Sequence, residues 1–139
     1  MWTVWVIIML EVGVNSREVN VLLVDDEPQI RNLLERVLMK AGSYHVLTAS
    51  SGEDALDLSR NQTDNIDILV TDIDLGKMSG IELYRHIREE RPETMVLFIS
   101  GKGKFFRNSL PEGPLLEKPF SLREFMAKVV ELRSTAQVL

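Results

Sequence analysis

Short apolar runs alternate with amphipathic segments along most of this chain. The runs occupy residues 19–24, 44–49, 66–71, 95–99 and 115–117. Runs of valine, leucine and isoleucine without polar alternation are typical of strands that are buried on both faces of a parallel sheet. Helices between successive parallel strands form right-handed crossovers. The sequence therefore predicts an α/β fold, in which helices cover both faces of a doubly wound, five-stranded parallel sheet.

Proline, glycine and capping residues mark where the connecting helices begin and end. Pro28 suits the first turn of a helix that stops at Gly42, and Ser121 with Glu124 forms a capping box that opens the last helix. Residues 101–114 contain three glycines and two prolines, which leaves room only for a few helical residues. We therefore expect the fourth helix to be short or irregular.

The length of the chain suits one domain preceded by an apolar segment. The chain has 139 residues, of which 45% are hydrophobic and 27% charged, which is enough for a single core. We expect the domain to span residues 19–135 and residues 1–18 to form an N-terminal extension or linker. This segment is too short for the ~20 apolar residues of a membrane span and lacks the basic start of a signal peptide. We predict no membrane span, and we expect any self-association to involve this segment.

Charge and residue usage exclude several classes of protein. A formal net charge of −5 at pH 7 repels the phosphate backbone, so direct nucleic acid binding is not expected. Cysteine is absent, which excludes disulfides and thiolate chemistry and is compatible with a reducing compartment. We therefore expect a cytoplasmic protein.

Polar side chains stand where the predicted strands end. Asp25 and Asp26 follow the first strand, Asp72 the third, Ser100 the fourth and Lys118 the fifth. In the flavodoxin-like strand order 2-1-3-4-5, these ends are successive neighbours about 5 Å apart. Three carboxylates so close together repel one another, and Lys118 compensates only in part. Oxygen ligands without histidine or cysteine favour a hard cation, and a shallow site completed by water suits Mg²⁺ better than Ca²⁺.

The same grouping suits the attachment of a phosphoryl group to Asp72. Asp72 would attack in line, the metal and Lys118 would neutralise the phosphoryl oxygens, and Ser100 would donate a hydrogen bond. Each residue alone has an ordinary explanation, such as helix capping or a solvated side chain. Their convergence at one edge of the sheet favours a functional site.

Four segments resemble the receiver domain of two-component response regulators. They are Val-Leu-Leu-Val-Asp-Asp-Glu-Pro at 21–28, Thr-Asp-Ile-Asp-Leu-Gly-Lys-Met-Ser-Gly at 71–80, Phe-Ile-Ser-Gly at 98–101 and Glu-Lys-Pro-Phe at 117–120. The segments occur in the order of the family, and the resemblance covers about residues 19–133. The part from 96 to 120 looks most like receivers fused to hybrid histidine kinases.

The resemblance implies a phosphorylation site and a partner. Asp72 would be the phospho-acceptor, and a histidine kinase or histidine phosphotransfer domain would supply the phosphoryl group. Ser100 would hold the switch hydroxyl, and Lys118, which precedes a cis peptide to Pro119, would contact a phosphoryl oxygen. Such a domain catalyses its own phosphorylation and dephosphorylation but turns over no external substrate.

The resemblance also implies how Mg²⁺ would be bound. Asp26 and Asp72 would bind the ion directly, and Asp25 would bind it through water. The backbone carbonyl of Asp74 would complete the protein ligands.

The chain departs from the usual pattern of the family near the acceptor and before the lysine. Gly76 stands where proline is usual, and Lys77 stands where a small residue is common, so we expect a different loop geometry. Leu115 occupies a position that is often aromatic and acts as a rotameric switch. Because leucine has no ring to swing, an aromatic readout of phosphorylation is not expected.

Two other functions remain open at this point. The segment Asp72-Ile73-Asp74 suggests an aspartate-nucleophile phosphohydrolase, although such enzymes carry this element before their acidic pair, whereas here the pair comes first. A pseudo-receiver that acts only as a binding surface is the other alternative. Repelling carboxylates that a purely structural domain does not need argue against it.

Overall fold

A parallel sheet forms the centre of the molecule. The structure, a computed structural model, describes residues 18–101, 110 and 112–138. Its strands are β1 (Val19–Val24), β2 (Tyr44–Ala49), β3 (Ile68–Asp72), β4 (Met95–Ser100) and β5 (Leu115–Glu117). They lie in the order β2-β1-β3-β4-β5, and all of the pairings are parallel. The predicted α/β fold and its flavodoxin-like strand order are confirmed.

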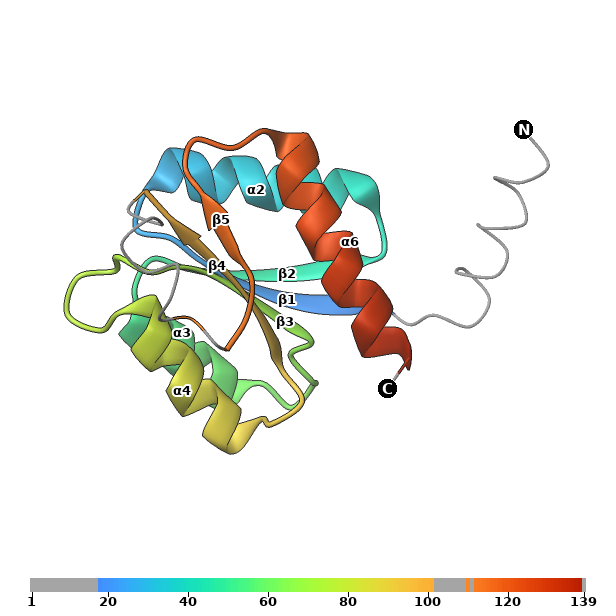
Figure 1. Cartoon of the computed structure of the whole chain (residues 1–139). Coiled ribbons are helices and arrows are strands. Elements are labelled where there is room, and N and C mark those ends of the chain that lie inside the picture. Colours follow the sequence, from blue (N-terminus) through green and yellow to red (C-terminus); the bar gives the residue numbers. More distant parts are fainter. Residues whose placement is uncertain (1–17, 102–109, 111, 139) are drawn as a thin grey trace, which may run out of the picture.

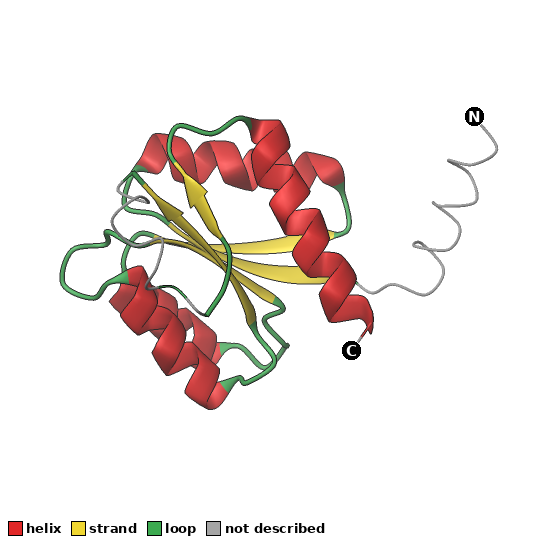
Figure 2. Ribbon diagram, in the orientation of Figure 1, coloured by secondary structure: helices red, strands yellow, loops and turns green. Residues whose placement is uncertain are grey.

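Helices cover both faces of this sheet. Those in the described part of the chain are α2 (Pro28–Ala41), α3 (Gly52–Asn61), α4 (Gly80–Glu90) and α6 (Leu122–Val138). Helices α2 and α6 lie on one face, and α3 and α4 lie on the other (Figures 1 and 2). Helix α2 begins at Pro28 and ends before Gly42, whose φ of 72° favours glycine. The predicted capping box is present before α6, where the Glu124 N–H donates to Ser121 Oγ at 3.0 Å.

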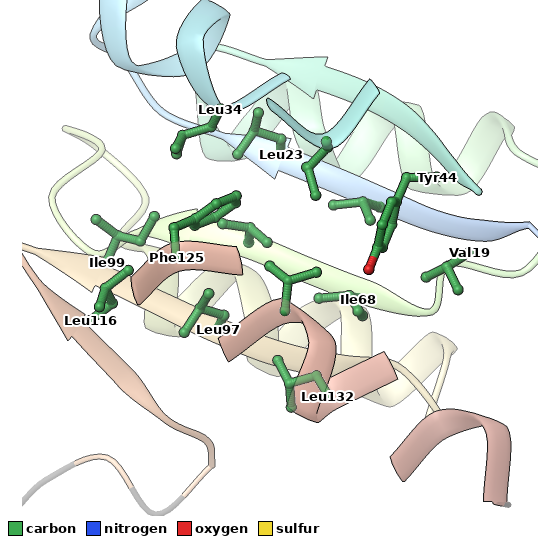
Figure 3. Packing of buried hydrophobic residues seen from close by; sticks show 14 residues of the cluster. Val19, Leu23, Leu34, Tyr44, Ile68, Leu97, Ile99, Leu116, Phe125 and Leu132 are labelled. Atoms are coloured by element: carbon green, nitrogen blue, oxygen red, sulfur yellow. The ribbon is translucent and has the colours of Figure 1, made fainter. Parts of the chain in front are cut away.

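The strands divide their side chains between two hydrophobic cores. Val21 and Leu23 of β1 pack with Phe125 of α6 in one core, whereas Leu22 and Val24 belong to the core beneath α3 and α4. Each of these side chains is at most 1% exposed. Figure 3 shows the first core, in which Phe125 of α6 belongs to the same cluster as Leu34 of α2 and Leu97 of the sheet. Burial on both faces explains why the sequences of β1, β3 and β4 lack polar alternation.

The strand boundaries differ from the sequence expectation at β3 and β4. The apolar run predicts a strand over residues 66–71, but β3 covers Ile68–Asp72. At Asp67, the side-chain Oδ2 accepts a hydrogen bond from the Asn20 N–H at 2.8 Å, while the Asp67 backbone N–H donates to the Asn20 carbonyl at 2.9 Å. Strand β4 also continues past residue 99 to Ser100. Asp72 and Ser100 are therefore the last residues of their strands rather than the first residues of loops.

Two expectations fall on residues outside the described part of the chain. One is the apolar extension of residues 1–18, of which only Glu18 is described, and the other is the short fourth helix, because residues 102–109 and 111 are not described. Among the residues that the structure describes, no helix combines the length and the apolar character that crossing a membrane requires.

Candidate functional site

The carboxyl ends of β1, β3 and β5 meet around an acidic pocket. Asp25 and Asp26 follow β1, Asp72 ends β3, and Lys118 follows β5. The pocket has a volume of about 470 Å³ and is lined by Asp26, Glu27, Asp72, Asp74, Gly101 and Lys118. The parallel order of the strands brings these side chains together, since every strand points its carboxyl end to the same edge.

The ammonium group of Lys118 joins the acidic side chains. Its Nζ lies 2.8 Å from Asp72 Oδ2, 2.7 Å from Glu27 Oε1 and 3.6 Å from Asp25 Oδ2. Burial alone would lower the pKa of Lys118, but hydrogen bonds to Asp72 and Glu27 outweigh it and raise the pKa above its usual range. Lys118 is therefore charged at neutral pH and neutralises part of the cluster.

The backbone fixes the position of Lys118 beside β4. The Lys118 N–H donates to the Ser100 carbonyl at 2.9 Å, and the peptide bond from Lys118 to Pro119 is cis, as the family resemblance implies. Ser100 itself is fully buried at the end of β4, next to the pocket.

Asp25 lies at the base of the cluster and is 1% exposed. Its Oδ1 accepts a hydrogen bond from the Glu27 N–H at 2.8 Å, whereas its Oδ2 is buried and accepts none. Burial raises the pKa of Asp25 to about 6, against the opposing effects of the Glu27 N–H and the Lys118 ammonium. The buried carboxylate is thus incompletely compensated by the protein.

Asp72 is held from two sides. Its Oδ1 accepts a hydrogen bond from the Asp74 N–H at 2.9 Å, and its Oδ2 accepts one from Lys118 Nζ. Burial raises the pKa of Asp72, although the bonds from Lys118 and Asp74 lower it. The side chain is oriented and close to a fixed positive charge, which suits a nucleophile that attacks an anionic group.

Two glycines shape the loop that follows Asp72. Gly76 has a φ of 91°, which the ring of a proline cannot adopt, so the loop takes a backbone path that a proline there would exclude. Gly80 begins α4 directly against β3. A Cβ on Gly80 would lie 2.2 Å from the Asp72 carbonyl oxygen, so only glycine allows this approach.

Comparison with known proteins identifies this arrangement. A sequence profile of the response regulator receiver domain matches residues 21–130, a range that contains every residue of the pocket. The chain belongs to the response regulator receiver family.

Receiver-containing proteins of different architectures are similar to this chain. CpdR of Brucella abortus, a response regulator receiver protein, is 34% identical over 116 residues, which cover 81% of this chain and 94% of CpdR. The sensor kinase CckA of the same organism is 35% identical over 121 residues, which cover 84% of this chain and 13% of the kinase. PhoP of Bacillus subtilis, an alkaline phosphatase synthesis transcriptional regulatory protein, is 34% identical over 122 residues. These cover 85% of this chain and 50% of PhoP, so the chain spans half or less of the latter two relatives.

Solved receiver structures share the fold. The receiver domain of the hybrid histidine kinase CckA superposes with a TM-score of 0.71 at 28% identity, covering 81% of this chain and 97% of that domain. A receiver domain protein of Clostridium thermocellum gives a TM-score of 0.77 at 26% identity, covering 86% of this chain and 98% of the other. The likeness to a hybrid kinase receiver agrees with the resemblance seen in the sequence.

The acidic cluster of this receiver fits a hard divalent cation. One carboxylate oxygen from each of Asp25, Asp26, Glu27 and Asp72 can lie within 4.8 Å of the others. All of these donors are oxygens, and Asp25 Oδ2 is buried without a hydrogen bond. Oxygen donors around uncompensated negative charge are what Mg²⁺ requires.

Glu27 is the acidic residue of the pocket to which the sequence analysis assigned no role. The expected residues Asp25, Asp26, Asp72 and Lys118 lie together, as described above. Glu27 is the third acid of the run that begins at Asp25, and this was the only signal in the sequence. Its pairing with Lys118 spans 91 residues, so no local pattern could reveal it.

Proposed function

We propose that this receiver domain accepts a phosphoryl group on Asp72, with Mg²⁺ as cofactor. The observation that carries the proposal is the oriented Asp72 carboxylate, whose Oδ2 lies 2.8 Å from Lys118 Nζ in an acidic pocket. The carboxylate is the nucleophile, and the lysine supplies positive charge where the phosphoryl oxygens would lie. Membership of the receiver family supports this role.

The donor is a phosphohistidine of a histidine kinase or of a histidine phosphotransfer domain. In the transfer, an Asp72 oxygen forms a bond to phosphorus, while the bond from phosphorus to the imidazole nitrogen breaks and the imidazole leaves. In dephosphorylation, water attacks the phosphorus and the Asp72 carboxylate leaves. The domain thereby catalyses its own phosphorylation and dephosphorylation without an external substrate, in the cytoplasm.

The chain's own residues would hold the ion and the phosphoryl group. Asp26 and Asp72 would bind Mg²⁺ directly, Asp25 would bind it through water, and the Asp74 carbonyl would complete the protein ligands. When bound, the ion neutralises the negative charge that gathers as the phosphoryl group approaches. Support comes from the acidic cluster and from the buried Asp25 oxygen that lacks a hydrogen bond.

Lys118 and Ser100 take part after the group has arrived. Lys118 contacts a phosphoryl oxygen, because its Nζ already lies against Asp72. Ser100 supplies the switch hydroxyl from the end of β4. Its residue is fully buried in this structure, so the hydroxyl reaches the phosphoryl group only after a local movement.

The experiment is incubation with acetyl phosphate and Mg²⁺, followed by mass spectrometry of the intact protein. We expect one base-labile phosphoryl adduct, which is lost in Asp72→Asn and retained in Asp74→Asn, where the backbone N–H and carbonyl remain. An adduct that persists in Asp72→Asn would place the acceptor elsewhere. Absence of any adduct would favour a pseudo-receiver, and steady turnover of a phosphomonoester would favour a phosphohydrolase.

A further inference from the structure

Lys118 is shared between two carboxylates that have different positions in the pocket. Its Nζ lies 2.8 Å from the acceptor Asp72 and 2.7 Å from Glu27. Asp72 is buried, whereas the Glu27 side chain is 52% exposed at the mouth of the pocket. The exposed partner therefore makes a contact as short as that of the buried one.

The backbone of Glu27 is anchored, but its side chain does not cap the helix that begins after it. Glu27 is the N-cap residue of α2, and its side chain makes no capping hydrogen bond. Its N–H donates to Asp25 Oδ1 at 2.8 Å, which anchors the residue beside the cluster. The carboxylate accepts a hydrogen bond from Lys118 Nζ instead of from an N–H group of its own helix. Its position thus reflects the attraction of the ammonium group.

A phosphoryl group on Asp72 would compete with Glu27 for the same ammonium group. Its oxygens would lie beside Asp72 Oδ2, which Lys118 Nζ now contacts. A lysine that is also paired with a second carboxylate, Glu27, is less free to follow these oxygens. We propose, on the basis of the proposed function, that Glu27 is a positioning residue that restrains Lys118 in the unmodified protein and so slows phosphoryl uptake by Asp72.

The ion pair has little influence on the stability of the fold. A half-exposed carboxylate contributes little through an ion pair, because water screens its charge. The Glu27 carboxylate instead affects the position of the Lys118 ammonium group, and so the rate of phosphorylation rather than the stability of the fold. Removing the Glu27 charge is therefore expected to change a rate while leaving the unfolding transition in place.

The test measures the initial rate of Asp72 modification by acetyl phosphate at saturating Mg²⁺. In this reaction an Asp72 oxygen forms a bond to phosphorus, the bond from phosphorus to the acetyl oxygen breaks, and acetate leaves. We expect Glu27→Gln to raise the rate about three- to tenfold. Glu89→Gln, which removes the same charge from an exposed position on α4, serves as the control and leaves the rate unchanged.

A double-mutant cycle shows whether Glu27 acts through Lys118. In the Lys118→Gln background, Glu27→Gln is expected to give no acceleration, because the restrained group is gone. The same acceleration in both backgrounds would overturn the proposal in favour of direct repulsion of the donor. A slower reaction with weaker Mg²⁺ binding by calorimetry would also overturn it, because Glu27 would then hold the metal.

The outcomes separate this inference from the proposed function. If the unchanged protein forms the adduct and Glu27→Gln reacts at the same rate, the restraint on Lys118 is wrong and the acceptor role of Asp72 stands. If the unchanged protein forms no adduct, the proposed function fails, and the inference fails with it.

Discussion

Gly80 meets Asp72 so closely that a methyl group on Gly80 would lie 2.2 Å from the Asp72 carbonyl oxygen. The Gly80 N–H also donates to the Ile73 carbonyl at 2.9 Å, which joins the start of α4 to the end of β3. The end of β3 and the start of α4 can therefore lie this close together only because Gly80 has no side chain.

Replacing Gly80 with alanine is expected to destabilise the protein. The added methyl group meets backbone atoms, which cannot rotate away, so α4 has to move. We expect the free energy of unfolding to fall by about 1–3 kcal/mol, measured by urea denaturation. Gly101→Ala is the matched control, because nothing lies within 4 Å of a Cβ there. Equal stability of the two variants would contradict the close approach.

The stability of the metal-free protein is expected to fall as the pH rises toward neutrality. Burial raises the pKa of Asp25 from 3.8 to about 6, so the folded protein binds a proton that the unfolded chain releases. The resulting stabilisation is complete below pH 3.8 and is lost as the pH rises through about 6. Its size is roughly 2–3 kcal/mol.

Asp25→Asn tests this dependence. In EDTA at pH 7.5, the variant is expected to be more stable than the unchanged protein toward urea, because it buries no charge at this position. The difference should shrink as the pH is lowered to about 4.5, where the folded protein carries Asp25 in its neutral form. Parallel stability curves over this range would show that Asp25 titrates normally.

Binding of Mg²⁺ should depend more on Asp26 than on Asp25. The proposed direct ligand Asp26 is exposed at the pocket, whereas Asp25 is buried and would act through water. We expect Asp26→Ala to weaken Mg²⁺ binding more than Asp25→Ala does, as measured by isothermal titration calorimetry. Equal losses would contradict the division into direct and water-mediated ligands.

Arg91, which lies between α4 and the start of β4 and away from the acidic pocket, is expected to be important for stability. Its guanidinium donates to the carbonyls of Ser59, Gln62 and Asp64, at 2.8, 2.8 and 3.0 Å, and so closes the end of α3. Arg91→Ala leaves these carbonyls without their donor and is expected to lower the free energy of unfolding by about 2 kcal/mol. Arg123→Ala, at an exposed position of α6, should change stability much less in the same thermal or urea measurement.

The sequence predicted the limits of three strands. The runs 19–24, 44–49 and 115–117 have the same limits as β1, β2 and β5, although His45 and Glu117 are exposed within them. The prediction for β3 began too early, at residue 66, whereas the strand begins at Ile68. Just before it, the Asp67 side chain accepts a hydrogen bond from the Asn20 N–H, a contact about which propensity and pattern carry no information.

The candidate site could be predicted as a group of strand ends but not as a set of contacts. The parallel topology alone places Asp25, Asp72 and Lys118 at one edge. The contact between Glu27 and Lys118 depends on how two loops meet in three dimensions, and the depth of Asp25 depends on the packing around it. These features follow from the finished structure rather than from local sequence.

The partners in this pocket come from parts of the chain that are far apart. Glu27 and Lys118 are separated by 91 positions, and Asp72 and Lys118 by 46. A chain that has formed only its first strands has the acids but no counter-charge, so the complete pocket exists only after β5 has joined the sheet. The balance of charge in the pocket is thus a property of the completed fold, and a truncation before β5 would leave the acids without Lys118 even if the remaining strands still paired.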